Sequence, residues 1–419
     1  MIPKKTTKMI VKDGNGDYLQ LLPEAYTDSA LNASSSDPIS NAAAMSALNA
    51  AAERVTELSL FKVMDEEPTA LNTQGTADKA IFAWIQPETW SITESIYDAS
   101  EDYGQIPFCL YGIENASITI DWGDGTIEEY AAENAVEHEC PTHEYAAAGN
   151  YTITMESQDF SRIYLQVIFI EGSECPRYYL STLKSINSPL PKIAGVQGQS
   201  ADWDDETGNY AWISQDNSFA SCFFFASNLE SIPSNLFKNN SSVTDFSYCF
   251  LNCTSLQSIP SGLFDSNTAA TGFNGCFSGC SSLQSIPSGL FDKNTAATRF
   301  DYCFNSCSSL TSIPAGLFDR NTAATNFDSC FYRCSSLQSI PEELFDKNTA
   351  ATSFYYCFRN CSSLADFTLH IGSSSVSSCN SFVTNQSGTT RTIYVPSGST
   401  TQTTFNAVAS SLGLTVIGE

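Results

Sequence analysis

A repeat of 27 residues constrains the fold of this chain more than any other feature of its sequence. Cysteines mark it most clearly: Cys249 recurs 27 residues later as Cys276, and a second series starts at Cys253 and recurs as Cys280. Five full units, the first beginning at Leu229, stand in register. A fixed period of this length predicts a stack of coils in which each unit contacts only its neighbours.

Each unit contains two groups of apolar residues that predict two short elements. The first group has the i, i+3, i+4, i+7 spacing that places side chains on one face of a short helix. In one unit this group is Phe300, Cys303, Phe304 and Cys307. The second group, Leu310 and Ile313, predicts a short strand that Pro314 ends. Asn321 and Thr322 then offer short polar side chains that can accept hydrogen bonds from free backbone N–H groups at a turn or helix start.

A single unit should not fold alone. Its eight apolar side chains contribute about 1.5–3 kcal/mol each. Ordering the backbone costs about 1–2 kcal/mol for every residue of the unit. The units must therefore bury one another's apolar faces, with neighbouring strands about 4.8 Å apart.

The repeat resembles the leucine-rich repeats of the BspA-like class, including its Mycoplasma-type branch. Units of that class carry the same run, F/M-x-x-C/M-F-x-x-C-x-x-L-x-x-I, and the resemblance covers about residues 180–370. It implies an α/β leucine-rich-repeat solenoid with one short strand and one short helix in each unit. We place this solenoid at 174–370, with an insertion at about 195–213 that interrupts the stack.

The paired cysteines of the repeat predict two ladders of buried thiols. Equivalent sulfur atoms of successive units lie about one strand spacing apart, and buried cysteine behaves as a small apolar residue. Disulfides and a metal site are the alternatives. Ala226 replaces one rung of the second ladder, so we interpret the cysteines as structural, with neither a metal nor another cofactor.

A different domain is expected upstream, over residues 101–173. Alternating apolar residues predict a strand that ends at Trp122, a turn at Gly123–Gly125 and a returning strand from Tyr151. The residues W-G-D-G at Trp122–Gly125 and H-x-Y-x-x-x-G-x-Y at His143–Tyr151 resemble a PKD-type, immunoglobulin-like module. This resemblance implies a β-sandwich that the matched residues hold together; Asp124 as a ligand is the alternative.

The two ends of the chain predict attachment and capping. Residues 1–100 contain a partly helical stretch with Met45, Leu48, Ala52 and Val55 at helical spacing, and no apolar core typical of a secretory signal follows the basic start. The stretch S-x-x-P-[IV]-x-N-x-x-x-x-x-A-L-N is similar to tail-fibre proteins of gut bacteriophages and prophages. Residues 371–419 predict a strand, a short amphipathic helix and a final strand, which would cap the last coil.

Charge and motifs exclude several classes of function. With 46 acidic and 19 basic residues, the formal charge of −27 opposes nucleic-acid binding. No apolar run reaches the length of a membrane span, and neither a phosphate-binding loop nor a G-x-S-x-G motif occurs. His138 and His143 are five residues apart with Pro141 between them, so they do not form a zinc-protease helix. We expect no catalytic residues.

Candidate binding residues come from comparing the units with one another. The apolar frame is constant, whereas certain positions of the expected helix vary and carry tyrosine and arginine, which make adaptable contacts at interfaces. These candidates are Tyr248, Tyr302, Tyr332, Tyr356, Arg299, Arg333 and Arg359. Ordinary solvated helix positions are the alternative interpretation.

The insertion supplies a second set of candidates, Trp203, Tyr210 and Trp212, beside the acidic residues of 202–206. Aromatic residues next to acids suit sugar stacking or a calcium site. A loop that packs back on the solenoid is the alternative.

Together these features predict a non-enzymatic recognition protein on a phage tail. The N-terminal segment would attach it to other virion proteins or to copies of itself, the PKD-like module would act as a spacer, and the repeats would bind a protein or glycan receptor on a bacterium. A BspA-like bacterial surface adhesin is the first alternative. A glycan depolymerase is the second.

Overall fold

The computed structural model describes two units, Met1–Pro87 and Glu88–Glu419. Its described residues are 9–12, 18–21, 88–96, 104–105, 108–109, 117–131, 141–157, 164–166, 181–193, 195–204, 209–384 and 388–419. In the first unit, β1 (Met9–Lys12) pairs antiparallel with β2 (Tyr18–Leu21). The stretch expected to be helical around Leu48 lies outside the described residues.

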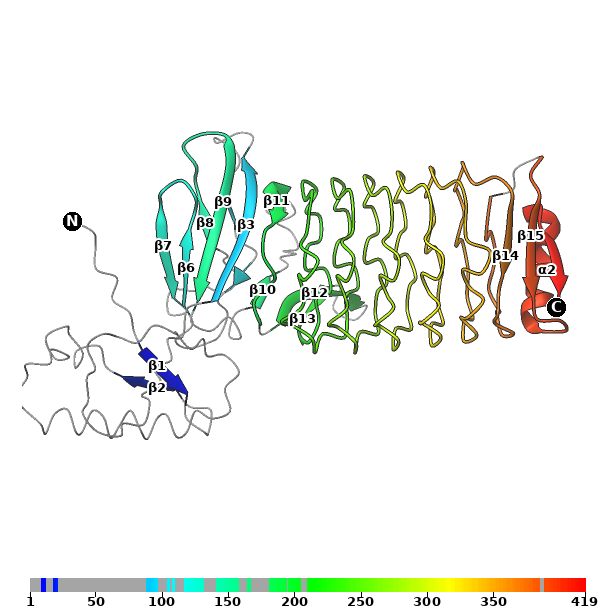
Figure 1. Ribbon diagram of the computed structural model, residues 1–419, viewed down its shortest axis with the longest axis horizontal. Helices are drawn as coiled ribbons and strands as arrows, with labels where there is room; N and C mark the ends of the chain where they lie inside the picture. The colour runs from blue at the N-terminus through cyan, green and yellow to red at the C-terminus, as the bar shows by residue number, and fades with distance from the viewer. Residues whose placement is uncertain are drawn as a thin grey trace, which may run out of the picture. The chain divides into compact units, whose positions relative to one another are not determined.

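A five-stranded antiparallel sheet precedes the repeats (Figure 1). Its strands, in spatial order, are β11 (Leu183–Ile186), β3 (Glu88–Ile96), β9 (Gly149–Ser157), β6 (Ser117–Asp121) and β7 (Ile127–Ala131). Alternating apolar side chains bury one side of the sheet, as with Trp90 and Ile92 of β3 and Ile153 and Met155 of β9. β3 was not expected, since it begins before residue 101.

The W-G-D-G segment forms the predicted turn between β6 and β7. Gly123 has φ +82, and a Cβ there would lie 2.5 Å from the carbonyl oxygen of Thr152, so only glycine fits. Asp124 accepts from the backbone N–H of Thr126 and lies 2.8 Å from Nε2 of His143, whose ring stacks on Trp122. The hydrogen bond from His143 lowers the pKa of Asp124. The Asp124 carboxylate is thus engaged in holding the turn.

The remaining strands outside the repeats form two smaller sheets. β4 (Gly104–Gln105) pairs with β8 (Thr142–His143), and a mixed sheet has the order β13-β12-β10-β5. The mixed sheet comprises β13 (Asn209–Asp216), β12 (Gly195–Asp204), β10 (Tyr164–Gln166) and β5 (Phe108–Cys109). The sheets outside the repeats are therefore small, and the PKD-type β-sandwich stays a prediction. The insertion, expected as a loop, is the antiparallel hairpin β12–β13.

The repeats stack coil on coil, as Figure 1 shows for the green-to-yellow part of the chain. Parallel bridges connect the first residues of successive coils. We number the coils 1 to 5 by these residues, which are Asp245, Gly272, Arg299, Asn326 and Ser353. The first coil is preceded by another at Ser218, and Ser185 of β11 bridges Ser231 of that coil.

The coils contain no helix, so the α/β leucine-rich-repeat solenoid expected from the sequence is wrong. The only helix within the described parts of the chain is α2 (Thr400–Leu412), outside the repeats. In coil 3 the backbone N–H groups of Phe300, Tyr302, Phe304 and Ser306 donate to the next coil, at 2.7–3.0 Å. Tyr302 and Ser306 have φ +58. A left-handed residue at every fourth position breaks an α-helix into successive turns, and the N–H groups that a helix would use inside the coil connect neighbouring coils.

The successive turns of a coil keep the apolar residues at i, i+3, i+4 and i+7 pointing inward, as the sequence predicts. The residues Phe300, Cys303, Phe304 and Cys307 are all fully buried, as are their equivalents in the other full coils. Phenylalanine rings stack along the coils, with Phe300 and Phe327 centroids 5.8 Å apart and 7° from parallel. Each full coil therefore contributes the same cross-section to one continuous core.

The predicted ladders of thiols run inside this core. The twelve cysteines from Cys222 to Cys379 that the structure describes are buried and free. In the second ladder each thiol donates to a phenylalanine carbonyl of the preceding coil, as Cys307 does to Phe277 at 3.2 Å. Burial raises the pKa of Cys307 well above its usual value. Among the described residues, no group of three or more His, Cys, Asp or Glu side chains is arranged to hold a metal.

Asparagine forms a third ladder. Asn321 is fully buried, and its Nδ2 donates to the carbonyl oxygens of Asn294 at 2.9 Å and Phe291 at 3.2 Å. We expected this side chain to accept from backbone N–H groups at a turn or helix start; it donates to the coil before it instead. The ladder therefore connects coils rather than capping an element.

The C-terminal region continues the stack with parallel strands. β14 (Phe367–His370), β15 (Arg391–Val395) and β16 (Thr415–Gly418) form one parallel sheet, and α2 connects the last two. The predicted strand–helix–strand order is confirmed. α2 starts at the N-cap Ser399 and ends at left-handed Gly413. Within the described residues, no helix is both long and apolar enough to span a membrane.

Candidate functional site

Variation among the coils is concentrated in one part of the repeat. Counted from the first residue of each coil, positions 2, 5, 6, 9 and 12 are identical in all five coils, whereas positions 1 and 7 hold a different residue in each. Positions 3, 4 and 8 also vary. We call positions 1, 3, 4, 7 and 8 of the five coils the variable face. Its 25 residues are five Tyr, five Ser, five Asn, three Gly, three Arg, three Asp and one Leu.

The backbone of the variable face is fixed by the ladder between coils. N–H groups at positions 2, 4, 6 and 8 donate to carbonyl groups at positions 1, 3, 5 and 7 of the next coil, for example from Tyr302 to Asp328 at 2.8 Å. Only side chains are thus left to contact a ligand. The stack presents them from a rigid backbone, which lowers the entropy cost of binding.

Bulky residues occupy strained backbone positions on this face. Tyr248, Tyr302, Tyr356 and Arg333 lie in the left-handed region at φ +57 to +61. A side chain there costs about 1–2 kcal/mol, which Gly275 avoids at the same position of coil 2. Local strain of this kind concentrates at functional sites. Stability alone would favour glycine or asparagine at these positions.

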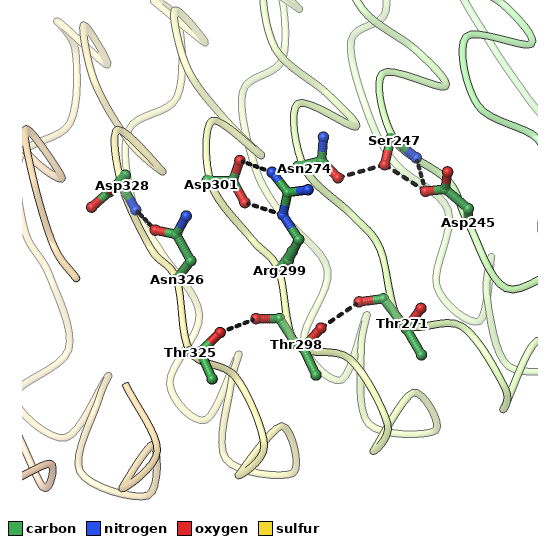
Figure 2. Close-up of polar contacts among 10 residues, drawn as sticks. All are labelled: Asp245, Ser247, Thr271, Asn274, Thr298, Arg299, Asp301, Thr325, Asn326 and Asp328. Carbon is green, nitrogen blue, oxygen red and sulfur yellow. Dashed lines mark hydrogen bonds and ion pairs between the residues drawn. The ribbon is translucent and has the colours of Figure 1, made fainter. Parts of the chain in front are cut away.

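The acidic residues of the variable face are held by neighbouring polar groups (Figure 2). Asp301 makes a two-point ion pair with Arg299, at 3.1 Å from Nε and 3.0 Å from Nη2. This contact raises the pKa of Arg299. Asp245 accepts from the backbone N–H and hydroxyl of Ser247, whose hydroxyl also lies 2.5 Å from Oδ1 of Asn274.

Asp328, at the same position of coil 4 as Asp301 in coil 3, is half-buried. It accepts from the hydroxyl of Ser353 and from the backbone N–H of Tyr355. Burial raises its pKa, and these two hydrogen bonds act in the opposite direction. Its own N–H donates to Asn326 at 2.9 Å (Figure 2). The carboxylates therefore order the face rather than stand free on it.

Tyrosine and arginine gather on coils 4 and 5. The rings of Tyr332 and Tyr356 stack with centroids 6.0 Å apart, and Tyr355 lies 3.8 Å from Tyr356. Arg333 lies over the ring of Tyr332 at 5.2 Å, and Arg359 over that of Tyr356 at 4.5 Å. We call these five residues the Tyr–Arg cluster. A hydrogen bond with Tyr355 and the charge of Arg359 lower the pKa of Tyr356.

The structure brings together four of the residues predicted from the sequence, namely Tyr332, Tyr356, Arg333 and Arg359. Tyr302 is 42% exposed on coil 3, whereas Tyr248 is half-buried and leans over Gly275. Arg299 is engaged by Asp301.

The candidates from the insertion lie on the hairpin β12–β13, outside the coils. Trp203 is opposite Tyr210 in the register, and Trp212 is opposite Gln199. Asp205 and Glu206, which would belong to a calcium site, lie outside the described residues.

Sequence reasoning missed position 3 altogether, and it named only Arg299 at position 1 and only Arg333 at position 8. Position 3 carries Tyr355, Asp301 and Asp328. The signal was present, because position 3 varies as much as position 4.

Neither the family models nor the curated proteins compared with this chain give a match. The variable face therefore has to be interpreted from its own geometry.

Proposed function

We propose that this chain is a non-enzymatic recognition protein of a phage tail, which binds a ligand on the bacterial surface through the variable face. The N-terminal segment would attach it to other virion proteins, in line with the similarity of the S-x-x-P-[IV]-x-N stretch to tail-fibre proteins. The repeats resemble BspA-like proteins in their inward residues, which supports a role in adhesion.

One observation carries this proposal: residues vary among the coils on one face, over a core that is nearly identical from coil to coil. If the side chains of the variable face had only a structural role, we would expect them to be as uniform as the neighbouring ladder of Thr271, Thr298 and Thr325 (Figure 2). The residue types that vary are Tyr, Ser, Asn, Gly and Arg, the types that dominate antibody binding loops. Tyrosine supplies rigid contact area and the small polar residues supply adaptable hydrogen bonds.

The proposal can be tested with the fluorescently labelled full chain on a panel of gut bacterial strains. We expect it to stain some strains and not others. The variant Tyr302→Ser/Tyr332→Ser/Tyr356→Ser should lower staining of those strains at least tenfold, because it removes the main aromatic contacts. Protection of the buried thiols from a thiol reagent would show that the variant is folded.

A matched control changes three exposed residues outside the variable face, Gln284→Ala/Ser288→Ala/Lys293→Ala. This control should stain like the unchanged chain. The proposal is wrong if no strain is stained, or if the tyrosine variant and the control behave alike.

A further inference from the structure

The Tyr–Arg cluster is the part of the variable face with uncommitted positive charge. Arg333 is exposed and Arg359 half-buried, and neither takes part in an ion pair with any residue that the structure describes. Arg299, by contrast, is paired, and Arg391 is buried among backbone carbonyl groups. In a chain of charge −27, two adjacent guanidinium groups without carboxylate partners provide a local site for an anion.

The acidic residues nearest in the repeat do not fill this site. Asp301 and Asp328 are at position 3 of their coils and are bound by Arg299, Ser353 and the N–H of Tyr355. The two arginines are at positions 7 and 8 and lie over the rings of Tyr332 and Tyr356. A ligand carboxylate could therefore meet the guanidinium groups, which bind carboxylates in a two-point geometry.

The cluster also offers flat surfaces and polar groups spaced by one coil. Tyr332 and Tyr356 come from neighbouring coils and are nearly parallel, at 27°. Asn360 is exposed beside them, with its Nδ2 3.4 Å from the hydroxyl of Tyr332, and Thr384 lies within hydrogen-bond distance of Asn360. Aromatic planes with a polar rim suit ring-shaped ligands that carry hydroxyl groups.

An extended peptide finds less to bind here. The N–H groups at positions 2, 4, 6 and 8 and the carbonyl groups at positions 1, 3, 5 and 7 are already used between coils, so these groups offer no free strand edge for a peptide to join. Among the described residues, the exposed large hydrophobic side chains are Ile127, Tyr302 and Ile417, and none belongs to the cluster. Apolar anchors, the other main mode of peptide binding, are thus lacking at this site.

We propose that the Tyr–Arg cluster binds an acidic glycan: the two guanidinium groups hold the carboxylate of an acidic sugar and the tyrosine rings stack on sugar rings. This assignment rests on the recognition function proposed above and names its ligand class. Binding should weaken with increasing salt, because exposed charges are screened.

The test measures binding of the full chain to oligomers of galacturonate, glucuronate and sialate by titration calorimetry. We expect at least one of the three to bind. Reduction of its carboxyl groups to hydroxyls should lower affinity at least tenfold, and so should the variant Arg333→Gln/Arg359→Gln. The matched control Arg320→Gln, an exposed arginine outside the variable face, should bind like the unchanged chain.

Three results would overturn the proposal: no binding of any acidic oligomer, equal binding of the carboxyl-reduced sugar, or tighter binding of a poly-glutamate peptide of the same charge. The last would indicate peptide recognition. Staining of bacterial cells separates the two proposals. If cells are stained and the tyrosine variant abolishes staining while acidic sugars do not bind, the recognition function stands and the ligand class is wrong.

Discussion

The left-handed residues at positions 4 and 8 decide the local structure of every coil. They end each turn after four residues, and their own N–H groups donate to the neighbouring coil, as those of Tyr302 and Ser306 do. Coil 2 fills both positions with glycine, Gly275 and Gly279, whereas coil 3 fills the first with Tyr302. The backbone is the same in both coils, so the fold does not require a tyrosine at this position. We therefore attribute the free-energy cost of Tyr302 in the left-handed region to a use of its side chain on the variable face.

Replacing one strained tyrosine should therefore separate stability from binding. We expect Tyr302→Asn to leave the free energy of unfolding unchanged or raise it by up to about 1 kcal/mol, because asparagine tolerates the left-handed region better. Asn252 and Asn360 already occupy such positions. Urea denaturation measures this effect. As a comparison, Phe300→Ala in the core of the same coil should cost about 3–5 kcal/mol; a loss of similar size from Tyr302→Asn would contradict the argument.

The buried asparagine ladder makes a second prediction at this scale. Asn294→Ala should lower the free energy of unfolding by on the order of 2 kcal/mol, because the carbonyl oxygens of Asn267 and Phe264 lose their donor inside the core. Asn305→Ala, on the half-exposed variable face, serves as the control and should change stability by less than about 0.5 kcal/mol. Equal effects of the two substitutions would show that the ladder does not hold the coils together.

At the scale of the element, the coil rather than the strand or helix is the unit of this structure. The inward residues could be read from the sequence because burial depends on their spacing alone, and Phe300, Cys303, Phe304 and Cys307 point inward as expected. The absence of a helix could not be predicted, because two consecutive turns produce the same i, i+3, i+4, i+7 spacing of inward side chains. In the sequence, the left-handed conformation at positions 4 and 8 is indicated clearly only in coil 2, where both residues are glycine.

The variation among coils was equally visible in the sequence, but its meaning depends on the element. A helix within one unit predicts contacts among that unit's own positions, such as 3 with 7, and no contacts between neighbouring units. In the observed turns, Tyr332 at position 7 of one coil stacks on Tyr356 at position 4 of the next. Contacts between coils, which no single unit contains, create the Tyr–Arg cluster.

If the coil is the unit, one whole coil can be removed without loss of the fold. Deleting residues 272–298 connects Thr271 to Arg299, which takes the place of Gly272 with the inward residues still in register. We expect a cooperative unfolding transition and full protection of the remaining repeat thiols. Deleting residues 272–285 removes about half a period and should expose thiols, because inward and outward positions then exchange. Thiol protection in both variants, or in neither, would contradict the coil as the unit.

At the scale of the whole molecule, the repeats contribute little to the acidic character of the chain. Residues 245–352 contain nine acidic and five basic residues, so most of the charge of −27 lies elsewhere. A nearly balanced repeat region allows an anion to approach the Tyr–Arg cluster despite the acidic chain. The same region concentrates another kind of titratable group, the buried thiols.

These thiols should make the fold sensitive to alkali. Burial raises the pKa of eleven cysteines above the value of 9.0 for an exposed thiol; Cys361 and Cys379, for example, have a pKa of about 12. The folded state thus keeps protons that the unfolded chain releases. Stability is complete below about pH 9 and is lost as pH rises above it, at roughly 1 kcal/mol per thiol and pH unit.

Eleven such groups together should lower the free energy of unfolding by on the order of 10 kcal/mol between pH 9 and pH 10, which matches the whole stability of a typical domain. We therefore expect the repeats to unfold cooperatively in this range, under reducing conditions, as followed by circular dichroism and thiolate absorbance. Cys303→Ala should release one proton fewer on unfolding and lower the pH slope of stability by roughly 1 kcal/mol per unit. A stability that stays constant from pH 8 to pH 10 would show that the thiols are not held protonated in the core.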